Sequence, residues 1–166
     1  MDYFTSALIS KYTTKIPPEF DWFAPLIGDW DFSYHDNQDG IRRDIQGEWL
    51  FRRILNGTGI GDMLLCSTRD TMTGRSQTGG EYGMSIRMFN AQAKCYDVTY
   101  TCEAYMQRLR FVKEGDKLVG TAAENPNEKW VFSCINANSF QWNHITVLEN
   151  SSWRHIGSLY ATRKRH

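Results

Sequence analysis

The sequence lacks the features that mark several large classes of protein. Basic and acidic residues balance at 19 each, so the chain carries no net charge. A general nucleic-acid binder needs a basic surface to displace counterions from phosphates, and binding to an anionic membrane by charge alone needs one too. No run approaches the ~18 apolar residues of a membrane span. The first 20 residues also lack the basic start and long apolar run of a signal peptide. We therefore expect a cytoplasmic protein without a nucleic-acid or membrane partner.

Familiar motifs for catalysis and nucleotide binding are also missing. The chain contains no GxSxG elbow, P-loop, HExxH or Rossmann glycine pattern. The glycine-rich residues 57–61 precede an apolar run typical of a strand, whereas a phosphate-binding loop precedes a helix. None of the four cysteines forms a CxxC pair, so we expect reduced thiols, and nothing dictates a disulfide. No cofactor is predicted.

Short apolar runs separated by turn residues dominate the chain from residue 28 onward, and aromatic residues make up 14% of it. Asn56-Gly57 between two such runs is the strongest hairpin signal. Short connections make neighbouring strands antiparallel, and a long meander removes its exposed edges by closing. We predict an all-β fold, a closed up-and-down antiparallel barrel of about ten strands, with a Greek-key sandwich as the main alternative. The expected strands are 28–36, 41–55, 60–69, 81–89, 95–103, 105–112, 117–123, 129–135, 140–148 and 153–162, with a polar loop over 70–80 and a fraying tail at 163–166.

The N-terminal part of the chain has a different pattern. Residues 2–11 carry one apolar stripe typical of a short helix, which Pro17-Pro18 would end. The aromatic residues 20–27 could form a helical turn that plugs one end of the barrel. We expect a helical segment or lid over 1–20 and one barrel domain over 21–166, since a chain of this length is usually one domain.

Several runs resemble a known family. Leu26–Trp30 is similar to the Gly-x-Trp signature that opens lipocalin-like barrels. Together with the runs 47–51, 54–57, 60–62, 81–83, 85–89, 129–132, 138–142 and 161–163, it resembles uncharacterised bacterial lipocalin-like (calycin) domains of unknown function. The resemblance covers roughly residues 22–163. It implies the calycin architecture and transfers no activity or catalytic residue.

The last two predicted strands place two histidines near each other. A turn centred between Asn150 and Ser151 pairs Thr146 with His155 and His144 with Gly157. One face then carries Trp142, His144, Thr146, Trp153 and His155. The two imidazoles could orient a ligand or act as an acid–base pair. Alternatively, one is a wall residue and the other is exposed. We predict no metal site, because zinc needs three or four ligands.

One other strand pair and one single strand offer charged candidates. A loop over 91–94 places Ser85 opposite Tyr100 and Arg87 opposite Val98, and a buried Arg87 could bind a carboxylate or phenolate. A slip of one residue would turn Arg87 to solvent instead.

On the strand over 41–55, alternation puts Glu48 and Arg52 on one face and Trp49 and Phe51 on the other. Trp49 and Phe51 look like the better inner wall. The alternative is a cavity carboxylate at Glu48, paired with Arg52 or Arg87.

These patterns support three functional hypotheses. The first is a barrel that binds a small apolar or amphipathic molecule. The second is a cofactor-free cyclase, isomerase or decarboxylase with His144, Arg87 and Glu48 as catalytic candidates and residues 3–16 as a lid. The third is a structural barrel with a filled interior, which could form a homodimer. The predicted ligand-binding residues are Trp49, Phe51, Arg87, Tyr100, Trp130, Phe132, Trp142, His144, Trp153 and His155.

Overall fold

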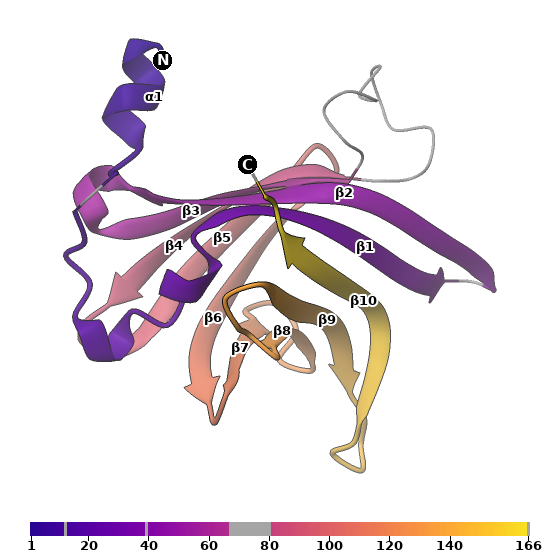
Figure 1. Ribbon diagram of the computed structural model, residues 1–166. Helices are drawn as coiled ribbons and strands as arrows, with labels where there is room; N and C mark the ends of the chain where they lie inside the picture. Colours follow the sequence, from indigo (N-terminus) through magenta and orange to yellow (C-terminus); the bar gives the residue numbers. More distant parts are fainter. Residues whose placement is uncertain (12, 39, 67–80, 166) are drawn as a thin grey trace.

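The chain folds into a closed antiparallel β-barrel, which the computed structural model describes for residues 1–11, 13–38, 40–66 and 81–165 (Figure 1). Ten strands of the described chain each pair with their neighbours in sequence, and β10 closes onto β1. The predicted all-β barrel is confirmed, and the Greek-key sandwich is excluded. The strands are β1 (Gly28–Gln38), β2 (Ile41–Ile54), β3 (Gly59–Leu65), β4 (Tyr82–Asn90), β5 (Cys95–Cys102), β6 (Met106–Glu114), β7 (Lys117–Ala122), β8 (Glu128–Ser133), β9 (Ser139–Val147) and β10 (Trp153–Arg163).

The predicted strand bounds agree with these to within a few residues. The predicted loop over 70–80 and the end of the predicted third strand, 67–69, lie outside the described residues. The prediction that residues 163–166 fray is wrong for Arg163 and Lys164, which are held by hydrogen bonds. The Arg163 guanidinium donates to the carbonyl oxygens of Ile27 and Pro25 at 2.9 and 2.8 Å. The Lys164 amide donates to the carbonyl oxygen of Asp29 at 2.9 Å. These bonds tie the end of the chain to the start of the barrel.

The Asn-Gly signal does mark the turn between β2 and β3, but the turn is a 3-10 segment, η3 (Leu55–Gly57), rather than a two-residue hairpin. All three of its residues have positive φ, and a Cβ at Gly57 would overlap the backbone of Thr13. The N-terminal chain packs directly against this turn, because the Lys15 amide donates to the Gly57 carbonyl oxygen at 2.8 Å. Glycine at 57 therefore serves both the turn and the close approach of the N-terminal segment.

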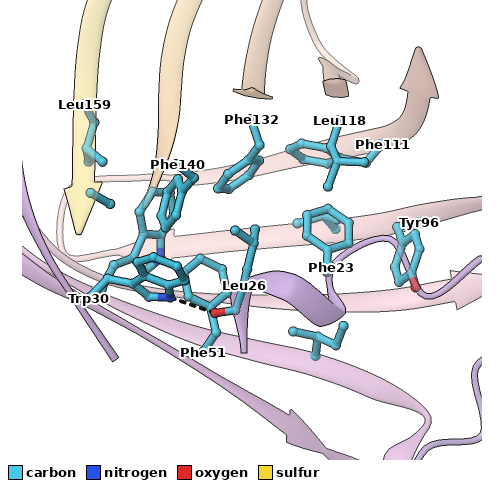
Figure 2. Close-up of a cluster of buried hydrophobic side chains, with 14 of the residues drawn as sticks. Phe23, Leu26, Trp30, Phe51, Tyr96, Phe111, Leu118, Phe132, Phe140 and Leu159 are labelled. Carbon is cyan, nitrogen blue, oxygen red and sulfur yellow. Dashed lines mark hydrogen bonds between the residues drawn. The ribbon is translucent and has the colours of Figure 1, made fainter. Parts of the chain in front are cut away.

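A segment before β1 plugs the adjacent end of the barrel. It contains two 3-10 turns, η1 (Pro18–Phe20) and η2 (Ala24–Leu26), and it inserts Phe23 and Leu26, both fully buried, into the interior (Figure 2). The Leu26 carbonyl oxygen accepts a hydrogen bond from the Trp30 indole at 2.8 Å, which anchors the plug to β1. The predicted plug is confirmed.

The half of the barrel next to the plug is filled with aromatic side chains. The ring of Phe23 meets those of Tyr96, Phe111 and Phe132 edge-on, with centroids 5.0 to 5.9 Å apart. Phe51 and Phe132 are completely buried in the same cluster (Figure 2). Strand alternation explains this core, because every second residue of each strand points inward.

Helix α1 (Tyr3–Leu8) stands outside the barrel beside η3 (Figure 1). Its N-cap is Asp2, whose carboxylate accepts a hydrogen bond from the Thr5 amide at 2.8 Å. None of its residues is buried, and Phe4 is 76% exposed. No helix of the described chain is long and apolar enough to cross a membrane.

The substitution Phe23→Ala tests the plug. Because Phe23 is fully buried among aromatic rings, we expect its truncation to lower the free energy of unfolding by about 3–5 kcal/mol, measured by denaturant titration. The matched control is Phe4→Ala on the exposed helix, which we expect to change it by less than about 0.5 kcal/mol. Equal effects of the two substitutions would contradict the assignment of residues 18–26 as a structural plug.

Candidate functional site

A cavity of about 400 Å³ occupies the half of the barrel away from the plug. Most of its lining residues lie toward the end of β1, β3, β5 and β9 or near the start of β4, β6 and β8, opposite the end that η2 closes, and Trp49 and Leu159 lie in the middle of β2 and β10. Tyr105 is 42% exposed, so the cavity reaches the surface at this end of the barrel. The described residues that line it are Tyr34, Trp49, Leu64, Cys66, Glu81, Ser85, Tyr100, Tyr105, Gln107, Glu128, Trp130, Trp142, His144 and Leu159.

An arc of four aromatic rings forms much of the wall. Tyr100 of β5 meets Trp130 of β8 with ring centroids 5.3 Å apart and an interplanar angle of 76°. Trp130 meets Trp142 of β9 at 5.6 Å and 71°, and Trp142 meets Trp49 of β2 at 6.2 Å and 79°. Each contact is edge-to-face, the arrangement that the ring quadrupoles favour. The arc therefore holds its rings in fixed orientations around the cavity.

The carboxylate of Glu81 is held by two tyrosines at the open end. The Tyr100 hydroxyl donates to it at 2.6 Å and the Tyr105 hydroxyl at 3.1 Å. Burial raises the pKa of both phenols, and the adjacent Glu81 carboxylate raises it further. Both hydroxyls therefore stay protonated and keep donating. Gly83 makes room for this arrangement, because a Cβ there would overlap the Tyr100 hydroxyl.

His144 and Glu128 form a second polar pair in the lining. Their nearest nitrogen and oxygen atoms are 3.6 Å apart. Burial lowers the pKa of the imidazole, while the charges of Glu128 and Glu81 oppose that shift. The imidazole is therefore neutral at pH 7. Within the described chain, His144 Nε2 and the neighbouring Trp142 Nε1 are buried without a hydrogen-bond partner.

Arg87 lies beside the cavity, buried in the core, and is absent from the described lining. The predicted register is confirmed, since Ser85 pairs with Tyr100 and Arg87 with Val98. Its guanidinium forms a buried ion pair with Asp62 of β3 and lies 5.0, 5.4 and 5.7 Å from the ring centroids of three phenylalanines. Asp62 also accepts a hydrogen bond from the Trp49 indole at 2.7 Å. The ion pair thus supports a wall residue of the cavity.

The alternative of a cavity carboxylate at Glu48 is wrong, and the preferred inward orientation of Trp49 and Phe51 is confirmed. Glu48 is buried on the outer side of the barrel, where the ammonium group of Lys164 contacts its carboxylate. Arg52, its proposed partner, pairs with Asp29 at 2.6 Å. The reason is strand alternation: Trp49 and Phe51 point inward, so Glu48 points outward. The C-terminal tail, expected to fray, supplies the lysine that compensates its charge.

The expected inner positions of Trp153 and His155 are also wrong. His144 pairs with Gly157 as predicted, but a β-bulge at Ile156 makes His155 pair with Ile145 rather than with Thr146. A bulge inserts one extra residue and so reverses the alternation beyond it. His155 is exposed, and Trp153 lies on the outer surface, where Lys117 Nζ is 5.5 Å from its ring centroid.

Five of the predicted site residues line the cavity, namely Trp49, Tyr100, Trp130, Trp142 and His144, whereas Phe51 and Phe132 lie in the filled half. Sequence reasoning missed both carboxylates of the lining. Glu128 stands two residues before Trp130 on the same face of its strand, a spacing that could have revealed it. Glu81 opens the predicted strand 81–89 and stands four residues before Ser85, so the same spacing rule places both on one face. No group of three or more His, Cys, Asp or Glu side chains in the described residues could hold a metal ion.

The N-terminal helix does not cover this cavity. It lies beside η3, at the plugged end (Figure 1). The cavity lining gathers at the other end. The alternative of a lid over residues 3–16 therefore has no support in this arrangement.

All four cysteines, including Cys66 in the cavity wall, carry free thiols.

Comparisons with known proteins support the fold alone. The chain is similar to the crystal structure of Rv2717c from M. tuberculosis, with a TM-score of 0.57 and 10% identity over 91% of this chain and 100% of that one. It is also weakly similar to a redesigned β-barrel, b11L5F_LGL, with a TM-score of 0.44 and 13% identity over 86% of this chain and 94% of that one. No protein-family description matches the sequence, and neither does any curated protein. A closed ten-strand barrel is thus shared with a solved structure. The lipocalin-like resemblance is not confirmed.

The buried ion pair predicts a large effect of Asp62→Asn. This substitution leaves the Arg87 guanidinium buried without a compensating charge, so we expect a loss of about 3–5 kcal/mol in the free energy of unfolding. The control is Asp97→Asn, which removes the partner of Arg110 in an exposed pair and should cost less than about 1 kcal/mol. Adding Arg87→Met to Asp62→Asn should recover part of the loss. Similar losses for the two single variants would contradict the account.

The environment of His144 predicts its titration. Because burial outweighs the nearby carboxylates, we expect its pKa, measured by NMR, below the ordinary value of about 6.5. Glu128→Gln should lower it further by removing an opposing charge. Since the folded state binds the proton less well than the unfolded state, stability should fall as pH drops from about 6.5 toward the folded pKa. A pKa above 6.5 would show that Glu128 dominates instead.

Proposed function

We propose that the barrel binds a small, largely apolar molecule in the cavity of about 400 Å³, with a polar end directed toward Glu81, Glu128 and His144. Small-molecule sites are typically apolar and aromatic cavities with a few placed polar groups. The described lining has this composition, and three of its residues are tryptophans.

The contrast between the two halves of the interior carries this proposal. Near the plug, phenylalanine rings from the strands pack with Phe23 and Leu26 of the plug and fill the interior. In the other half, aromatic residues of the same strands stand around an unfilled space. A barrel whose interior is purely structural would gain stability by filling that space as well, because a void costs dispersion contacts. The hypothesis of a filled interior therefore fits the half of the barrel next to the plug but not the half that contains the cavity.

No enzyme is proposed on these observations. Of the three catalytic candidates, Glu48 is on the outer side and Arg87 is paired with Asp62 in the core. His144 alone remains in the cavity wall.

We further propose a cytoplasmic location, which suits the free thiols. We also propose a relationship to lipocalin-like domains, which rests on the sequence motifs and the barrel.

A cavity-filling substitution tests the proposal with the neutral fluorescent probe N-phenyl-1-naphthylamine. Ser85 is buried in the cavity wall, so Ser85→Phe should fill the space and weaken probe binding at least about tenfold in a fluorescence titration. The control Thr101→Phe changes an exposed residue of β5 and should leave binding unchanged. Thermal unfolding of both variants would verify that they fold.

A second pair of variants removes the dependence on Ser85→Phe. Trp142→Ala, in the wall, should weaken probe binding, whereas Trp153→Ala, on the outer surface, should not. Equal probe affinity in the wild type, Ser85→Phe and Trp142→Ala would place the probe elsewhere and overturn the proposed function.

A further inference from the structure

We propose that the cavity selects ligands with a cationic amine head, either quaternary or protonated, attached to a small apolar body. The inference rests on the proposed function, since it names the chemical class of the ligand for the same cavity. Three features of the described lining carry it: its carboxylates, its aromatic rings, and the way in which its other charges are compensated.

The charges in the wall favour a cation. Glu81 and Glu128 lie in the lining, and no Lys or Arg belongs to the part of the lining that the structure describes. The nearest buried cation, Arg87, is compensated by Asp62. A ligand carboxylate or phosphate would meet two like charges in a partly desolvated site, whereas an ammonium group would be attracted by both.

The aromatic arc favours the same head group. A cation is attracted to the face of an indole or phenol ring by the ring quadrupole, and Trp binds it best. Trp49, Trp130 and Trp142 contribute three indoles to one cavity, and Tyr100 adds a phenol. A neutral hydroxyl or amide could also donate to the carboxylates, but it would gain little from the rings. The combination of rings and carboxylates therefore points to a cation rather than to a neutral donor.

The carboxylate of Glu81 is pre-organised for such a contact. Two phenol hydroxyls near the β5–β6 connection fix it, at 2.6 Å for Tyr100 and 3.1 Å for Tyr105. Tyr100 also packs against Trp130, so the carboxylate and the arc are held in one network. Little side-chain freedom then remains to be lost when a ligand binds. His144, kept neutral by burial, adds no competing positive charge.

The experiment compares two probes of the same shape, benzyltrimethylammonium and neopentylbenzene, in which a quaternary carbon replaces the charged nitrogen. Isothermal titration calorimetry on the whole chain gives both affinities. We expect the cation to bind about tenfold tighter than its neutral isostere, from cation–π and carboxylate attraction together. Benzylphosphonate, the anionic counterpart, should bind more weakly than either.

Substitutions assign the preference to the lining. Glu81→Gln and Glu128→Gln should each reduce the ratio of the two affinities, and the double variant should reduce it further, leaving only the contribution of the aromatic rings, while the affinity for neopentylbenzene stays the same. The control Glu124→Gln removes an exposed carboxylate that pairs with Arg108 outside the barrel, and it should leave the ratio unchanged.

Failure of this inference is distinguishable from failure of the proposed function. If both probes bind with equal affinity in the wild type and compete with N-phenyl-1-naphthylamine, the cavity binds ligands without selecting cations, and only the ligand class is overturned. The same holds if the cation's advantage in the double variant is as large as in the wild type. If neither benzyl probe nor N-phenyl-1-naphthylamine binds, both proposals are overturned.

Discussion

The ion pair between Arg87 and Asp62 lies where the two halves of the barrel interior meet. On one side, its guanidinium packs among the rings of Phe23, Phe51 and Phe132, so it contacts both the plug and the strands. On the other side, Asp62 holds the indole of Trp49 in the cavity wall. Burial lowers the pKa of Arg87 to about 9, because the apolar core disfavours the charged guanidinium. The Asp62 carboxylate is therefore needed for the Arg87 guanidinium to be buried among these rings.

The polar groups inside the barrel differ in whether another residue compensates their charge. The pair at the centre is compensated within the core, whereas Glu81, Glu128 and His144 stand toward the open end, where a ligand could meet them. Glu48, which faces the outer side, is compensated by Lys164 of the C-terminal tail. This arrangement leaves the cavity with carboxylates and aromatic rings in the described lining, and this composition underlies both the proposed binding function and the proposed preference for cations.

Much of the fold could be predicted from the sequence because period-two alternation and short turns determine a meander. The register of β4 and β5 was predictable in the same way, since the loop between them is short. The face of β10 was not, because a bulge at Ile156 leaves no clear mark in the residues and reverses the positions of Trp153 and His155. Asp62 was missed because a partner from a neighbouring strand cannot be read from one strand's pattern. Glu81 was missed because alternation along the predicted strand 81–89 groups it with Ser85 but does not show that this face points inward.

The central claim is that the cavity at the open end binds a small molecule against the tryptophan arc. The most direct measurement follows the indole N–H cross-peaks of the six tryptophans in a two-dimensional NMR titration with benzyltrimethylammonium. The account predicts shifts at Trp130 and Trp142, smaller shifts at Trp49, and none at Trp153 on the outer surface. Shifts centred on Trp153, or no shift at Trp130 and Trp142 when the probe binds, would contradict it.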